Sequence, residues 1–244
     1  MAARMITLGG KKVTLAGTAK GSGMIAPNMA TMLAFITTDA AISASMLQKA
    51  LVYAAGITFN KVTVDNHMST SDTALVLASG LAGNRRITRS DKDFAVFQKA
   101  LWQVCDELAQ QMAADGEGAK AAIRIEVTGA ANAQDARLAL RSISDSPLVR
   151  TAFAGADPNW GRIISAVGYS GAKCVQEKME CRIAGVTVFK AGQPRRFDAQ
   201  KLSAKMKQKQ WSVQVDLGMG KASDFCYTCD LTHEYITINA DYHT

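Results

Sequence analysis

The organisation of the chain follows from one stretch, KGSGMIAPNMATMLAFITTD, residues 20–39. Up to Ala30 it is rich in Gly and Asn and holds one Pro, residue types that form loops because they permit positive φ, fix φ or bond back to their own backbone. From Met32 to Thr38 it is apolar and β-prone, as a short buried strand is. The loop therefore meets the strand at Thr31.

Thr31 is a candidate nucleophile because it is a small hydroxyl residue at the junction of loop and strand. The small Ala30 before it leaves the Ala30–Thr31 peptide bond open to attack. A threonine at the start of a strand is also an ordinary β-branched strand residue. The residues alone leave both interpretations open.

Length and composition limit the class of protein. The chain has 244 residues, 48% of them hydrophobic, which is enough for a substantial core in one large domain or two modest ones. Its apolar runs are interrupted well short of the roughly 20 residues that a membrane span needs, and residues 1–8 lack the apolar core of a signal peptide. We expect no membrane partner and a cytoplasmic location.

The formal net charge of +7 raises the question of a nucleic-acid partner. Its basic residues are scattered or lie in short runs, and the aromatic content is 7%, with no aromatic-interleaved basic stripe. We therefore expect no nucleic-acid partner, and a basic surface that is solvated or attracts anionic substrates. A non-enzymatic basic binding module is an alternative.

The five cysteines are an odd number spread through the chain, which is typical of reduced thiols. Cys226 and Cys229 have the spacing of a redox or zinc pair. No second pair stands nearby in the sequence, and His233 is the one imidazole at plausible range. We predict no metal.

Hydrophobic periodicity predicts alternating strands and helices. Helices are expected at 43–55, 71–79, 91–114, 133–143 and 198–206. Strands are expected at 9–15, from residue 31, at 62–64, at 123–127 and at 234–240, with shorter elements at 148–154, 161–168, 182–190 and 211–217. We expect two lobes of one α/β unit: residues 1–150, which carry the nucleophile, and residues 151–244, which contribute to the substrate site.

Residues 20–39 closely resemble the self-cleavage segment of the ornithine acetyltransferase family, also called bifunctional glutamate N-acetyltransferase. Five further motifs resemble that family in its own order: VDNHMSTSDT (64–73), DGEGA (115–119), SPLV (146–149), DPNWGRI (157–163) and INADYHT (238–244). The resemblance covers nearly the whole chain. It implies an α/β layered sandwich of the ornithine acetyltransferase type, with a strand that opens on the nucleophile.

The resemblance also implies the chemistry. The bond between Ala30 and Thr31 would be cut by the protein itself, and the freed Thr31 would accept an acetyl group from N-acetylornithine and pass it to glutamate, in arginine biosynthesis. No cofactor is implied, and acetyl-CoA is left open as a second acetyl donor. The residues that match the family's substrate contacts are Lys20, Thr31, Glu117, Asn239 and Thr244.

Each of these residues also has a plainer interpretation. Lys20 is otherwise a solvated loop lysine, Glu117 a carboxylate at a helix terminus, and a chain end such as Thr244 is ordinarily frayed. DPNWGRI is otherwise a structural corner, and we assign it no catalytic role. The related N-terminal-nucleophile aminopeptidases or amidohydrolases, which transfer the acyl group to water, are an alternative function.

Two features differ from the family pattern. Family members carry Thr and Lys directly after the Gly-Glu-Gly-Ala run, where this chain has Lys120 and Ala121. Their precursors also extend further upstream, and that part holds the Thr-Gly pair of the oxyanion hole. We expect an upstream (alpha) chain that completes a heterotetramer-like assembly.

Overall fold

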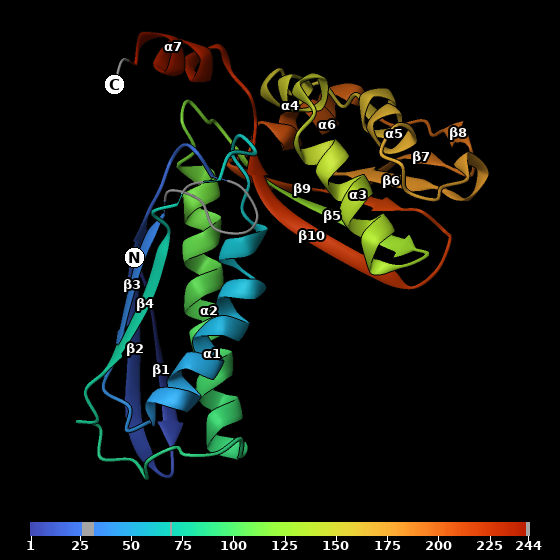
Figure 1. Ribbon diagram of the computed structural model, residues 1–244. Coiled ribbons are helices and arrows are strands. Elements are labelled where there is room, and N and C mark those ends of the chain that lie inside the picture. The colour runs from blue at the N-terminus through green and yellow to red at the C-terminus, as the bar shows by residue number, and fades with distance from the viewer. Residues whose placement is uncertain (26–31, 69, 243–244) are drawn as a thin grey trace. The chain divides into compact units, whose positions relative to one another are not determined.

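The computed structural model describes residues 1–25, 32–68 and 70–242 (Figure 1). Internal contacts divide the chain into two compact units, Met1–Met112 and Ala113–Thr244. The boundary expected near residue 150 falls inside the second unit, within α4 (Pro147–Ala154). Each unit has its own sheet and helices.

Unit 1 is built on a sheet with the strand order β1-β2-β3-β4. The β1–β2 and β2–β3 pairs are antiparallel, and β3–β4 is parallel. Its elements are β1 (Ala2–Leu8), β2 (Lys11–Lys20), β3 (Leu33–Thr38), α1 (Ala44–Gly56), the 3-10 turn η1 (Phe59–Lys61), β4 (Thr73–Ala78) and α2 (Lys92–Ala114), which ends just beyond the unit boundary. β2 and β3, the strands before and after residues 26–31, are therefore neighbours in one sheet.

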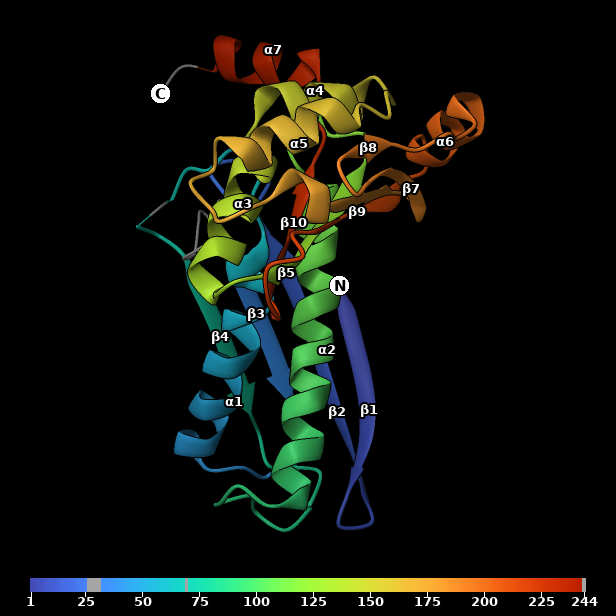
Figure 2. The same ribbon diagram turned by 90° about the vertical axis from the view of Figure 1, so that its right-hand side faces the viewer.

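The two faces of this sheet differ. Figures 1 and 2 show α1 and α2 against one face, where Leu15 and Ile36 are buried and Gly17 lies close to Leu108 of α2. The opposite face carries exposed apolar side chains: Met5 (66% exposed), Phe35 (46%), Leu75 (40%) and Leu77 (57%). Strand side chains alternate between faces, so one sheet supplies both a core and an apolar surface, here called the outer face.

Unit 2 is built on a sheet with the strand order β10-β5-β9-β6-β7-β8. Its strands are β5 (Ala122–Ala130), β6 (Glu180–Ile183), β7 (Val186–Lys190), β8 (Gln193–Pro194), β9 (Gln210–Asp216) and β10 (Ala222–Cys229). Its helices are α3 (Ala133–Ser144), α4, α5 (Trp160–Gly168), the 3-10 turn η2 (Gln176–Lys178), α6 (Ala199–Met206) and α7 (His233–Asp241). The helix α3 packs on β5 and β10, and the stacked rings of Trp160 and Phe189 join α5 to β7.

Three secondary-structure predictions are wrong. The helix expected at 71–79 is the strand β4, because Leu75 and Leu77 lie two apart on one sheet face and not along a helix stripe. The strand expected at 62–64 is a single bridge residue, Val62. The strand expected at 234–240 is the helix α7, which has no buried residue. β-propensity mainly reflects the fit of a side chain to a pleated, half-buried surface. Residues 233–241 have no buried side chain, so their β-prone residues gain nothing from a strand.

Truncating a side chain should cost much more stability on the buried face of the unit 1 sheet than on its outer face. Leu15→Ala should lower the free energy of unfolding by about 2–5 kcal/mol, because Leu15 is fully buried under the helices. Leu77→Ala, on the outer face of the same sheet, should change it by less than about 0.5 kcal/mol. Urea unfolding of the isolated chain measures both values. Equal losses would contradict the assignment of faces.

Candidate functional site

Asp65 holds the chain just before residues 26–31. Its Oδ2 accepts a hydrogen bond from Met24 N–H (2.7 Å), and its Oδ1 accepts one from Ile25 N–H (3.0 Å). Val64 N–H donates to the Ile25 carbonyl at 2.7 Å. The ring Nδ1 of His67 lies 2.8 Å from the Asp65 carbonyl oxygen. The loop after η1 is therefore tied to the end of the glycine-rich segment.

Asp72 holds the chain just after residues 26–31. Its Oδ1 accepts a hydrogen bond from Met32 N–H at 2.7 Å, and Thr73 N–H donates to the Met32 carbonyl at 3.0 Å. Burial raises the pKa of Asp72 above its ordinary value, and the bond from Met32 N–H offsets part of that rise. The same bonds bring β3 and β4 into parallel register, starting with Leu33 opposite Thr73.

The predicted cleavage residues Ala30 and Thr31 lie outside the described residues, and so does Thr244. Lys20 is the last residue of β2, is exposed, and pairs with Leu33. It therefore lies across the ladder from the position two residues after Thr31. The antiparallel register places this predicted substrate residue beside the strand that the predicted nucleophile precedes.

Two predicted substrate residues meet in unit 2. Asn239 Nδ2 of α7 donates a hydrogen bond to Glu117 Oε2 at 2.9 Å, although 122 positions separate them in the sequence. The contact depends on Gly118, whose φ is +66° and where a Cβ would lie 2.6 Å from Tyr235 N in α7. Thr232 Oγ1 also donates to the Gly118 carbonyl at 2.7 Å. The glycine lets the backbone of α7 approach the loop that carries Glu117.

Asp230 fixes the same loop, and sequence analysis missed it. Its side chain is 3% exposed, and its Oδ1 accepts hydrogen bonds from Lys120 N–H (2.8 Å) and Ala121 N–H (3.0 Å). Because these bonds use backbone N–H groups, they do not depend on which side chains occupy positions 120 and 121. An isolated Asp after a strand gives no signal that it will be buried against a loop 109 residues earlier.

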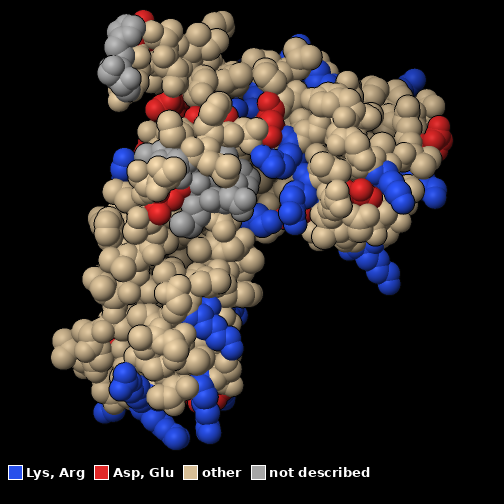
Figure 3. All heavy atoms as spheres, in the orientation of Figure 1, with Lys and Arg blue, Asp and Glu red and all other residues tan. Residues whose placement is uncertain are grey.

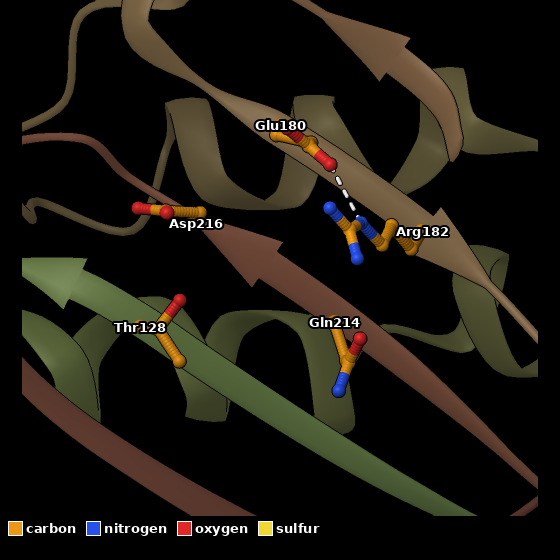
Figure 4. A pocket seen from close by; sticks show the side chains of 5 residues that line it. All are labelled: Thr128, Glu180, Arg182, Gln214 and Asp216. Carbon is orange, nitrogen blue, oxygen red and sulfur yellow. Dashed lines mark hydrogen bonds and ion pairs between the residues drawn. The ribbon is translucent and has the colours of Figure 1, made fainter. Parts of the chain in front are cut away.

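A hollow of about 230 Å³ lies on unit 2, and none of the predicted site residues lines it (Figure 4). It is lined by Thr128, Glu180, Arg182, Gln214 and Asp216, which lie on one face of β5, β9 and β6 with helices behind the sheet. Hydrogen bonds from Lys190 (2.8 Å) and Arg182 (2.6 Å) hold the pKa of Glu180 below its ordinary value. These charges are paired with each other, so we assign the hollow no ligand.

The remaining charge and thiol features define no further site. Within the described ranges there is no group of three or more His, Cys, Asp or Glu side chains able to hold a metal ion. Cys226 and Cys229 form no disulfide and are buried, and their odd spacing on β10 points the two side chains to opposite faces of the sheet. Figure 3 shows Lys and Arg side chains gathered at the end of unit 1 that bears the β1–β2 turn. No helix in the described part of the chain is long and apolar enough to cross a bilayer.

The whole chain, residues 1–244, matches the model of the ArgJ family, and the chain belongs to that family. A protein of Bacillus licheniformis named "Arginine biosynthesis bifunctional protein ArgJ" is 45% identical over 239 residues, covering 98% of this chain and 59% of the relative. A protein of the same name from Halalkalibacterium halodurans is 48% identical over 236 residues, covering 96% and 57%. The chain thus spans less than two thirds of the length of these curated relatives.

A solved structure gives the same result for the fold. The crystal structure of arginine biosynthesis bifunctional protein argJ from Bacillus halodurans matches with a TM-score of 0.78 and 44% identity, covering 84% of this chain and 97% of the solved one. The family resemblance and the α/β fold class expected from the sequence are therefore confirmed.

Mutation of Asp230 and mutation of Glu117 should change the stability of the protein by different amounts. Asp230→Ala should lower the free energy of unfolding by about 2–3 kcal/mol, because it leaves two backbone N–H groups without their charged acceptor. Glu117→Ala should leave stability nearly unchanged, since its bond to Asn239 is exposed. Thermal unfolding measures both. A large loss for Glu117→Ala would mark it as structural.

Proposed function

We propose that this chain carries the nucleophile of an acetyltransferase that moves an acetyl group from N-acetylornithine to glutamate, in arginine biosynthesis and in the cytoplasm. The observation that carries the proposal is the family match over residues 1–244, with identities of 45–48% to proteins named for arginine biosynthesis. Within that match Thr31 stands directly before Met32, whose N–H and carbonyl are both held in place.

The proposed chemistry explains why cleavage before Thr31 is needed. A threonine hydroxyl is a weak nucleophile and needs an adjacent base. Cutting the Ala30–Thr31 bond frees an α-amino group, whose unperturbed pKa is about 7.7–8.0, on the same residue. The hydroxyl oxygen then takes the acetyl group as ornithine leaves, and the glutamate amino group removes it as N-acetylglutamate.

Three described residues are proposed to bind the substrates. Lys20 can pair with a substrate carboxylate, and its place opposite Leu33 supports this role. Glu117 can pair with a substrate amino group, and Asn239 already donates a hydrogen bond to it. Thr244 is proposed to join them, as the family motif at the end of the chain implies.

The sheet of unit 1 should hold both cleavage products together. A cut before Thr31 would leave β1 and β2 on one piece and β3 and β4 on the other, joined by the β2–β3 ladder from Leu15↔Thr38 to Lys20↔Leu33.

Self-cleavage gives the direct test of this proposal. Intact-mass spectrometry of the purified protein should show two pieces, residues 1–30 and 31–244, that elute together in native buffer and separate in urea. Thr31→Ala should remain whole, because it removes the hydroxyl that attacks the Ala30 carbonyl. The proposal is wrong if the wild-type protein stays whole after long incubation with the upstream polypeptide of a family member.

We also propose that an upstream polypeptide packs on the outer face of unit 1. The relatives are longer than this chain, which spans 57–59% of their length. The apolar outer face, with Phe35, Leu75 and Leu77 at 40–57% exposure, is the kind of surface that soluble proteins usually cover. That polypeptide would supply the oxyanion donors that the family resemblance places upstream.

Adding the upstream polypeptide in trans should raise acetyl-transfer turnover by about 100-fold or more, the usual effect of oxyanion donors. Leu77→Asp should weaken this activation, because it puts a charge on the outer face. Leu81→Asp is the matched control, since Leu81 is 86% exposed and lies after β4, outside the sheet. Full turnover of the chain alone, or equal effects of the two variants, would contradict the proposed partner surface.

A further inference from the structure

Arg150 of α4 is a buried arginine, with 6% of the residue exposed. Its Nε donates a hydrogen bond to the Cys229 carbonyl oxygen at 2.9 Å, and its Nη2 donates to the sulfur of the same residue at 3.3 Å. Arginine is almost never buried unless its N–H groups are paired. Because both contacts go to one residue 79 positions away, they hold the end of β10 against α4.

The backbone of Arg150 holds the chain a second time. Leu231 N–H donates a hydrogen bond to the Arg150 carbonyl oxygen at 3.1 Å. One residue of α4 therefore contacts the chain on both sides of Asp230. Since β10 is the terminal strand of its sheet, Arg150 fixes the course of the chain at the point where it leaves the sheet.

The segment 229–232 joins α4 to the loop 117–121, here called the Glu117 loop. Asp230 Oδ1 accepts hydrogen bonds from two backbone N–H groups of this loop, at 2.8 and 3.0 Å. Thr232 Oγ1 donates to a carbonyl oxygen of the same loop at 2.7 Å. The segment then continues directly into α7, which carries Asn239. Arg150 thus holds one side of the segment, and the Glu117 loop lies on the other.

We propose that Arg150 is a positioning residue for substrate binding, which holds the segment 229–232 in the place where Glu117 and Asn239 meet. This inference rests on the proposed function, because it takes Glu117 as the residue that binds the substrate amino group. Arg150 acts through Glu117 and does not touch the substrate. Its fork of N–H groups suits this task, since a single side chain can reach two acceptors in a fixed geometry.

A purely structural role for Arg150 makes a different prediction. Loss of its hydrogen bonds would then lower the melting temperature and the folded fraction, which reduces the apparent kcat but leaves KM unchanged. A positioning role raises KM instead, and only while Glu117 is present. The two substitutions would then be non-additive, as expected for residues that act through a shared contact.

The test uses the full chain complemented with the upstream polypeptide, and measures KM and kcat for N-acetylornithine together with the melting temperature. Arg150→Met removes every donor and keeps an apolar stem. It should raise KM by about 10-fold, within the range that coupled residues show in double-mutant cycles, and should add less than about 2-fold to the KM of Glu117→Ala. Arg150→Lys, which keeps the charge and a donor, should restore most of the affinity. If Arg150→Met does not fold, Arg150→Gln, which keeps one N–H donor group, takes its place in the cycle.

Arg162→Met is the matched control. Arg162 also donates a hydrogen bond to a backbone carbonyl of α4, that of Leu148 at 2.7 Å, and its second partner, Thr151 Oγ1, lies in α4 as well. The variant should leave KM unchanged. Hydrogen exchange gives a further readout that does not require activity. The amide hydrogens of Lys120 and Ala121 should exchange faster in Arg150→Met than in Arg162→Met.

The outcomes separate the inference from the function on which it rests. With an active wild-type enzyme, an unchanged KM in Arg150→Met, an equal rise in Arg162→Met, or a rise that persists in full beside Glu117→Ala would overturn the role of Arg150 alone. An unchanged KM in Glu117→Ala would overturn the substrate role of Glu117 and this inference together. An inactive wild-type enzyme would overturn the proposed function itself.

Discussion

The antiparallel pairing of β2 with β3 is the constraint on which the rest of unit 1 depends. The ladder runs from Leu15↔Thr38 to Lys20↔Leu33, so the chain leaves β2 and returns as its neighbour in the same sheet. Both ends of the segment between these strands are therefore fixed before any side chain acts on them. Asp65 and Asp72 then tie each end to a single loop through backbone N–H groups. Because these bonds use backbone N–H groups, they do not depend on which side chains the segment carries.

A chain held on both sides of a bond can be cut there without coming apart, which is what a self-activating nucleophile requires. The β2–β3 ladder would still join the two pieces after such a cut. In unit 2, contacts to the backbone likewise position the proposed substrate residues. Asp230 and Gly118 fix a loop and the backbone of α7 against each other, and Glu117 and Asn239 meet as a result.

The sequence predicts much of this fold because hydrophobic periodicity reports burial. The long helix α2 and the strand β5 lie where their apolar spacing indicates. The failures share one cause: local pattern does not show which surfaces exist nearby. The apolar residues Leu75 and Leu77 favour a helix at 71–79 in the sequence, but they lie exposed on the strand β4. The β-prone residues Ile236 and Ile238 favour a strand at 234–240, but they lie exposed on the helix α7.

The site divides in the same way. Lys20, Glu117 and Asn239 can be selected from the sequence because a family resemblance marks them, although composition does not. The hydrogen-bond partners of the residues that position the site cannot be found in this way, although Asp72 itself lies in the motif at 64–73. Asp72 acts through a bond to a backbone 40 positions away, and Asp230 through bonds 109 and 110 positions away. Nothing in the local sequence around either carboxylate specifies such a partner, and the structure is needed to find it.

The central claim is that Thr31 carries the acetyl group between donor and acceptor. The most direct measurement is to mix the cleaved enzyme with N-acetylornithine in the absence of glutamate, quench in acid, and map the peptides by mass spectrometry. The account predicts one acetyl group on the peptide that begins at Thr31, in ester linkage to its side chain, and its rapid loss when glutamate is added before the quench. An acetyl group found only on other residues, or one whose loss glutamate does not accelerate, would contradict it.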